Sequence, residues 1–307
     1  MIANFFSKTK PINFVVLSIV MLIVFIIGMI NNLSEGISFI FLLKKSVYLL
    51  TAILTIFILN FIIRKNTLTD DNTYAILFFI LMIGFFSNTF FDKNIFAANF
   101  ILLFAFRRVY SLRSVIKPKE KIFDSAFWIG IASLFYVWSV IYLLLLFAAI
   151  WAFKKRDWKN IFIPIIGFIT PIFLLFTYLL MVNNLSRFYE FRNFNYSFIL
   201  DKYVSIKYLI PILFLVGMAL ISIFPTIRKA LLSKIDFKST WNILIFHVLL
   251  SLVIVTIAPI KKGSEFLFLF FPLGILFANY LQIIKKYWVK ETILYLFLAV
   301  LITVSVI

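Results

Sequence analysis

Long apolar runs recur along the whole chain, from residue 12 to residue 307, and only short polar segments separate them. A helix needs about 20 mainly apolar residues to cross the hydrocarbon core of a bilayer. Inside the bilayer every backbone polar group needs a partner within the protein, which a helix provides for itself. Charged residues make up only 14% of the chain, whereas a soluble domain has about a quarter. We therefore expect an all-α, polytopic transmembrane helical bundle.

The apolar runs predict about eleven membrane spans within a single integral-membrane domain, residues 1–307. The predicted spans are 12–30, 46–63, 74–91, 94–106, 122–136, 137–153, 160–182, 208–225, 241–258, 264–283 and 291–307. The fifth and sixth segments meet at residues 136–138 without a turn residue. The pattern leaves open whether these two segments are separate helices or one long helix.

The basic residues between the runs predict the topology. With the amino terminus inside, more than two thirds of the 30 Lys and Arg residues fall in the inner segments, as the positive-inside rule predicts. Lys8 and Lys10 precede a first run that is longer than a signal-peptide core and lacks a small-residue cleavage site, so we expect a retained span. The chain is thus expected in a bacterial inner membrane, with its amino terminus cytoplasmic and its carboxyl terminus periplasmic.

The net charge of +18 does not indicate nucleic-acid binding, because the basic residues lie between apolar runs and not on one soluble face. The absence of cysteine excludes disulfides, thiol nucleophiles and cysteine metal sites. The sequence has no Gly-rich phosphate loop, zinc-binding His-Glu pair or Gly-x-Ser-x-Gly motif. We expect the lipid bilayer and other membrane proteins as partners, no nucleic acid and no metal.

Charged residues of both signs gather in the segments that this topology places outside. Glu35 follows the first span, and the candidate ligands of a phosphate group are Arg187, Arg192, Lys202, Lys261 and Lys262. Basic groups hold phosphate oxygens, and a nearby carboxylate can serve as a base. A lipid-linked phosphate or pyrophosphate is therefore the candidate ligand, with Glu35 as the candidate base; no other cofactor is evident. Solvated charges, or contacts with lipid head groups, explain the same residues without a bound substrate.

His247 is the only ionisable side chain deep within a predicted span. A proton relay would need a carboxylate at a similar depth, so a hydrogen bond from His247 to a neighbouring helix is the favoured interpretation. The inner segment 107–113 is strongly basic. Retention of this segment on the inner side and contact with anionic lipids account for its charge.

Two stretches resemble known families. The first is residues 123–136, FDSAFWIGIASLFY, followed by an apolar run and the basic turn 154–158; the second is residues 261–280, KKGSEFLFLFFPLGILFANY. Together they resemble an uncharacterised multi-pass inner-membrane protein family of flavobacteria and their relatives, which bears only a domain-of-unknown-function label. The resemblance covers most of the chain and implies no activity.

The same stretches also resemble the GT-C superfamily of glycosyltransferases, which use polyprenyl-phosphate-linked sugars. The similarity lies in residues 130–134 and in the run from Lys262 to Pro272. It implies a GT-C-like architecture with a catalytic acid in the first outer loop, where this chain has Glu35. The chain departs from the family because Glu35 stands without a second acid, and because Phe135 and Tyr136 replace a basic residue and a proline. These departures concern catalysis more than fold.

Three functions follow as hypotheses. The favoured one is an accessory or structural subunit of a membrane protein complex, built on a GT-C-like scaffold. The alternative is a GT-C-like glycosyltransferase that uses a polyprenyl-phosphate-linked donor at the periplasmic face. A lipid or solute transporter comes third, because the spans carry few charged residues and the chain has only 8 glycines.

Overall fold

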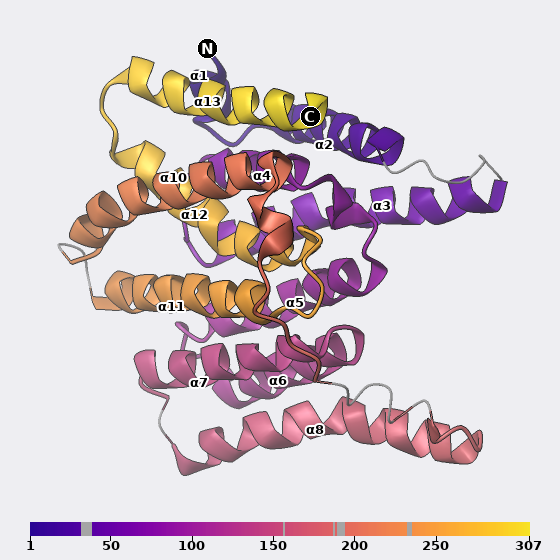
Figure 1. Cartoon of the computed structure of the whole chain (residues 1–307). Helices are drawn as coiled ribbons and strands as arrows, with labels where there is room; N and C mark the ends of the chain where they lie inside the picture. Colours follow the sequence, from indigo (N-terminus) through magenta and orange to yellow (C-terminus); the bar gives the residue numbers. More distant parts are fainter. Residues whose placement is uncertain (32–38, 156, 187, 189–193, 232–234) are drawn as a thin grey trace. The chain divides into compact units, whose positions relative to one another are not determined.

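The computed structural model describes the chain except for residues 32–38, 156, 187, 189–193 and 232–234 (Figure 1). In the described residues, all regular secondary structure is helical. The α-helices are α1 (Ile2–Phe6), α2 (Pro11–Asn31), α3 (Phe39–Lys65), α4 (Tyr74–Phe85), α5 (Lys93–Ser111), α6 (Pro118–Phe135), α7 (Tyr142–Ala152), α8 (Trp158–Met181), α10 (Ile206–Leu231), α11 (Ile235–Ile257), α12 (Leu267–Ile283) and α13 (Tyr287–Val306). The 3₁₀ helices are η1 (Ser87–Phe90), η2 (Val137–Ile141), η3 (Asp201–Val204) and η4 (Ser264–Phe266).

Each predicted segment overlaps one α-helix, so the all-helical prediction is confirmed for the described residues. Seven helical stretches there are long and apolar enough to cross a membrane. They are Pro11–Ile30, Lys45–Lys65, Trp158–Met181, Ile206–Leu231, Phe237–Ile257, Ser264–Ile283 and Tyr287–Val306. The helices Tyr74–Phe85 and Val137–Ala152 are apolar but shorter. The chain therefore has the helices of a multi-pass membrane protein, and the number of eleven spans stays a prediction.

The fifth and sixth predicted segments are two helices and not one. α6 ends at Phe135, and Tyr136 has the extended backbone angles φ −142° and ψ 106° before η2 begins. The sequence carries no turn residue at this point, and two side chains just after the break contact distant segments. Trp138 donates a hydrogen bond from Nε1 to the carbonyl oxygen of Asn195 at 3.0 Å, and the Tyr142 hydroxyl lies 2.9 Å from the Ser251 hydroxyl.

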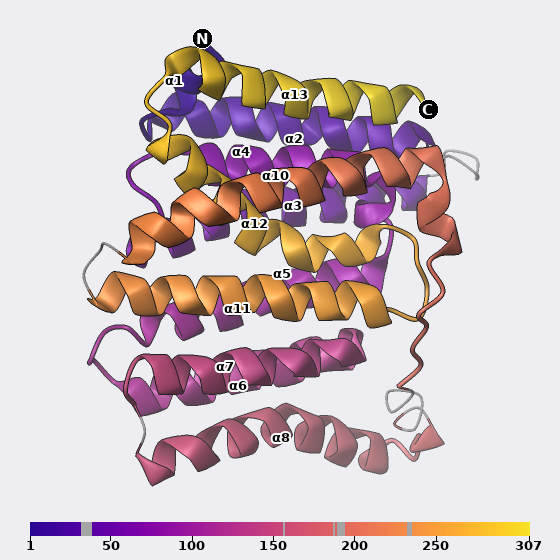
Figure 2. The ribbon, with the colours of Figure 1, turned by 60° about the vertical axis from the view of Figure 1, so that its left-hand side comes forward.

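The helices form two compact units. Unit 1 comprises Met1–Asp92, Ile199–Leu232 and Lys261–Ile307, and unit 2 comprises Lys93–Phe198 and Ser233–Ile260. Unit 1 thus holds α1 to α4, α10, α12 and α13, whereas unit 2 holds α5 to α8 and α11. Within unit 2 the helices run side by side in both views (Figures 1 and 2). The prediction of a single domain is not decided by this division.

The core of unit 1 is built on α4 and α12, which pack against each other. Both helices are apolar around their whole circumference, which is typical of a helix that is enclosed by others. Accordingly, 83% of the apolar window in Ser264–Ile283 is buried, against 22% in Trp158–Met181. Gly274 allows α12 close to α4, because a Cβ atom at this position would lie 2.8 Å from the carbonyl oxygen of Ala75.

In unit 2, α8 has one buried and one exposed face. In the first half of the helix the buried residues recur every three to four positions: Asn160, Pro164, Gly167 and Pro171. Leu179 is buried further along. The opposite face exposes large apolar side chains, such as Phe162 and Ile166. Exposed apolar surface of this extent is unusual for a soluble protein and suits contact with lipid.

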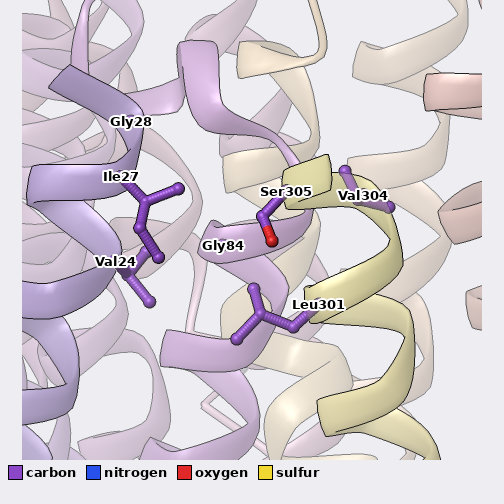
Figure 3. A pocket seen from close by; sticks show the side chains of 7 residues that line it. All are labelled: Val24, Ile27, Gly28, Gly84, Leu301, Val304 and Ser305. Atoms are coloured by element: carbon purple, nitrogen blue, oxygen red, sulfur yellow. The ribbon is translucent and has the colours of Figure 1, made fainter. Parts of the chain in front are cut away.

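The gap between α2, α4 and α13 in unit 1 has room for about one water molecule, with a volume of about 10 Å³ (Figure 3). Gly84 faces Leu301 there, and a Cβ atom on Gly84 would lie 2.3 Å from the Leu301 side chain. The gap is therefore a packing feature and not a ligand site.

Candidate functional site

Half of the predicted site lies outside the described residues. Glu35, the candidate catalytic acid, falls in residues 32–38, and the candidate phosphate ligands Arg187 and Arg192 fall outside as well. The prediction for these three residues is therefore not tested. Lys202, Lys261 and Lys262 are described, and all three belong to unit 1.

The loop that carries Lys261 and Lys262 turns sharply into η4 and α12. Gly263 has φ +86°, in the left-handed region that side chains disfavour. A Cβ atom on Gly263 would lie 2.9 Å from both Phe86 and Tyr208. The rings of Phe86 and Phe266 stack across this turn with centroids 4.5 Å apart. A glycine is thus required at this position for both conformational and steric reasons.

Glu265 lies at the centre of the loop, and its side chain is fully buried. The Tyr203 hydroxyl donates a hydrogen bond to Glu265 Oε1. On the other carboxylate oxygen, Oε2, the backbone N–H of Lys262 donates at 3.3 Å and the Ser264 hydroxyl at 3.4 Å. A buried carboxylate is costly unless donors compensate for its lost hydration. These contacts, all within unit 1, supply that compensation.

Two tyrosines connect η3 and the start of α10 to this loop. Tyr203 belongs to η3 and reaches Glu265, while the Tyr208 hydroxyl donates to the carbonyl oxygen of Lys262 at 3.2 Å. The structure thereby brings the segment of Lys202 next to the loop of Lys261 and Lys262. The sequence interpretation missed Tyr203, because an aromatic residue beside a charged one in a loop rich in aromatics carries no distinguishing signal.

The three described lysines differ in exposure. Lys202 and Lys262 are exposed, whereas only 5% of the Lys261 surface is accessible. Burial lowers the pKa of the Lys261 ammonium group from its usual value, and the nearby Glu265 carboxylate opposes part of this shift. Of the three described lysines, Lys202 and Lys262 are therefore the two whose exposed side chains can reach a ligand in solvent or in the lipid head-group region.

A second polar cluster lies inside unit 2, around His247 of α11. His247 is fully buried, and its Nδ1 atom lies 3.1 Å from the Tyr110 hydroxyl of α5. Ser251 donates to the carbonyl oxygen of His247 at 2.9 Å, and its hydroxyl also contacts Tyr142 of α7. The expected hydrogen bond between His247 and a neighbouring helix is confirmed. Within the described part of the chain, no three His, Asp or Glu side chains lie close enough together to hold a metal ion.

Comparison with known proteins gives a family but no activity. No curated protein and no solved structure matches the chain. The resemblance to GT-C transferases stays a prediction. A family model described as a family of unknown function, DUF6427, matches residues 1–307, which confirms the expected membership in a family of unknown function, and the chain therefore belongs to the DUF6427 family.

Proposed function

We propose that this protein is a multi-pass inner-membrane protein that acts as an accessory or structural subunit of a membrane protein complex. The observation that carries the proposal is the environment of Glu265, a fully buried carboxylate that accepts hydrogen bonds from Tyr203, Lys262 and Ser264 of the same unit. A carboxylate held in this way joins segments of the chain. This environment of Glu265 favours a structural role over a catalytic role for the described residues of the outer side.

A groove in unit 1 offers a place for a partner helix. It has a volume of about 530 Å³ and lies between α2 and α3. Its α2 wall follows one helix face from Pro11 to Leu22, about 16 Å at 1.5 Å per residue. Phe14 and Phe57 stack beneath it with centroids 6.0 Å apart. Ser18 is a small hydroxyl residue in this wall, of the kind that is common where membrane helices pack closely.

The contacts within unit 1 support the proposed topology. Segments that the charge pattern places inside lie together: Lys229 of α10 is 3.8 Å from Asp70, and the Asn279 side chain of α12 donates to the carbonyl oxygen of Leu68 at 2.8 Å. Segments placed outside also meet, as the Tyr203–Glu265 contact illustrates. The proposal retains the predicted eleven spans, inner amino terminus and outer carboxyl terminus.

The test is affinity purification of the tagged full chain from native membranes in a mild detergent, followed by mass spectrometry. We expect membrane-protein partners in constant ratio to the chain. Ser18→Phe fills the α2–α3 groove and should reduce the recovered partner at least tenfold. Val216→Phe is the matched control, because it adds a phenyl ring at an exposed apolar position of α10 in the same unit, and it should leave recovery unchanged.

Chemical cross-linking in native membranes, before detergent is added, is the second measurement. The subunit proposal would be overturned if the chain purifies alone and no partner is cross-linked to it. A chain that is alone and transfers a sugar from a polyprenyl-phosphate donor would replace it with the transferase, provided that Glu35→Gln abolishes transfer without changing the amount of protein in the membrane.

A further inference from the structure

α5 and α6 enclose a groove of about 480 Å³ that belongs entirely to unit 2. Its walls include Phe104, Arg107 and Arg108 of α5 and Asp124, Phe127 and Trp128 of α6. On each helix these residues are neighbours or lie three to four positions apart, so they share one helix face. All six side chains are half-buried, so the groove is neither sealed nor fully solvated.

The groove has a charged end and an aromatic end. Arg107 and Arg108 lie near the carboxyl end of α5, and Asp124 lies in the second turn of α6, so all three are close to the loop that joins the helices. Phe104 and Trp128 lie four residues further from that loop than Arg108 and Asp124, or about 6 Å along each helix. The rings of Phe104 and Trp128 contact each other with centroids 5.0 Å apart.

Two arginines, Arg107 and Arg108, and one carboxylate, Asp124, line the charged end of the groove. Arg108 Nη2 lies 2.7 Å from Asp124 Oδ2, and about a third of each side chain is accessible. This ion pair orients the Arg108 guanidinium group, and Arg107 lies beside it in the lining of the same groove. A guanidinium group presents up to five N–H donors in a planar fork, a geometry that matches the oxygens of a phosphate.

The loop beside the charged end exposes aliphatic side chains as well as basic ones. Val115 and Ile116 are 78% and 71% exposed, and Arg113 and Lys119 on either side of them are exposed too. Basic and aliphatic side chains together are typical of a segment that lies at the surface of an anionic membrane. An amphiphile with an anionic head group therefore matches the two ends of the groove.

We propose that the α5–α6 groove binds an anionic phospholipid. Arg107 and Arg108 hold the lipid phosphate, while Phe104, Phe127 and Trp128 contact the first part of an acyl chain. Asp124 positions the Arg108 guanidinium and, by its own negative charge, keeps binding weak enough for exchange with the bilayer. The inference rests on the proposed membrane placement of α5 and α6 and is independent of the role as a subunit.

Native mass spectrometry of the purified full chain tests this proposal. Dioleoylphosphatidylglycerol is titrated into the delipidated protein, dioleoylphosphatidylcholine is the zwitterionic comparison, and millimolar inorganic phosphate is the lipid-free anion. We expect the anionic lipid to bind more tightly than the zwitterionic one. Arg107→Gln and Arg108→Gln should each weaken it roughly fivefold, which is the usual effect of one basic residue near an anionic membrane. The matched control Arg113→Gln removes the same charge outside the groove and should change binding less than twofold.

Asp124→Asn distinguishes the groove from a general loss of folding. Removal of the competing carboxylate should tighten binding of the anionic lipid severalfold, and misfolding does not produce a gain. Equal affinity for the two lipids would overturn the proposal. So would a loss of affinity for the anionic lipid in Arg113→Gln as large as in Arg108→Gln. Displacement of the anionic lipid by inorganic phosphate would also overturn it, because the groove would then be a simple phosphate site. None of these results depends on whether partner proteins co-purify.

Discussion

At the scale of single residues, the described part of the candidate site is organised by Glu265, and not by the surface lysines that the charge pattern emphasised. Tyr203, Ser264 and the backbone of Lys262 donate to its carboxylate. A hydrogen bond to a buried charged group contributes about 1.5–3 kcal/mol to stability, roughly twice the value for neutral pairs. The Tyr203 hydroxyl is therefore expected to matter more for stability than any exposed residue of this loop.

Tyr203→Phe should lower the free energy of unfolding by about 2 kcal/mol, because it removes a donor from a fully buried carboxylate. The matched change Tyr208→Phe removes a hydrogen bond to an exposed backbone carbonyl, which water can replace, so it should cost less than about 1 kcal/mol. Thermal unfolding in detergent, followed by intrinsic fluorescence, compares the two variants. Equal shifts in Tm would contradict the structural role of the Tyr203–Glu265 contact.

At the scale of helices, the packing of unit 2 depends on two glycines in the contact between α6 and α8. A Cβ atom on Gly130 would lie 2.7 Å from the carbonyl oxygen of Phe168, and one on Gly167 would lie 2.8 Å from the carbonyl oxygen of Phe123. Backbone atoms cannot move aside as a side-chain tip can. The close approach of α6 and α8 therefore requires that neither position carries a side chain.

Gly130→Ala and Gly167→Ala should each destabilise the protein by about 1–3 kcal/mol through overpacking. Gly217→Ala in α10 is the control, because a Cβ atom there meets nothing within 4 Å. Alanine is the better helix former, so this control should be neutral or more stable by about 0.5–1 kcal/mol. Tm values in the same detergent measure all three variants. If Gly217→Ala lowers the Tm as much as Gly130→Ala and Gly167→Ala do, the loss of stability arises from replacing any helical glycine. It would then not be specific to the α6–α8 contact.

At the scale of the whole molecule, the exposed surface of many long helices is apolar. α8 and α10 expose residues such as Phe173 and Leu220, whereas α4 and α12 are almost completely buried. In water this arrangement would leave large apolar areas uncovered, which soluble proteins avoid. In a bilayer the same areas contact lipid, and the buried helices are those enclosed by other helices.

The topology can be tested by labelling single cysteines, because the native chain contains none. With a membrane-impermeant maleimide on spheroplasts, a cysteine in place of Lys202 should react and one in place of Lys286 should react only after the membrane is opened. Lys119→Cys decides whether α5 and α6 both cross the membrane. Protection of this cysteine agrees with eleven spans, and labelling from outside would reduce the number to nine.

The sequence by itself determined where the helices lie, and it indicated that they belong in a membrane. Apolar length is a local property, and neither the helix hydrogen bond nor burial in lipid depends on distant residues. Each predicted segment accordingly overlaps an α-helix in the structure.

Tertiary structure alone decided what distant residues do together. The pairing of Tyr203 with Glu265 and the α5–α6 groove with Arg108 and Asp124 both join residues from different segments. No periodicity or motif reports such contacts, because they depend on which helix faces meet, and the apolar faces of this chain are nearly uniform in composition. Packing therefore decided which residues come together in each candidate site, whereas the local sequence decided where each predicted helix forms.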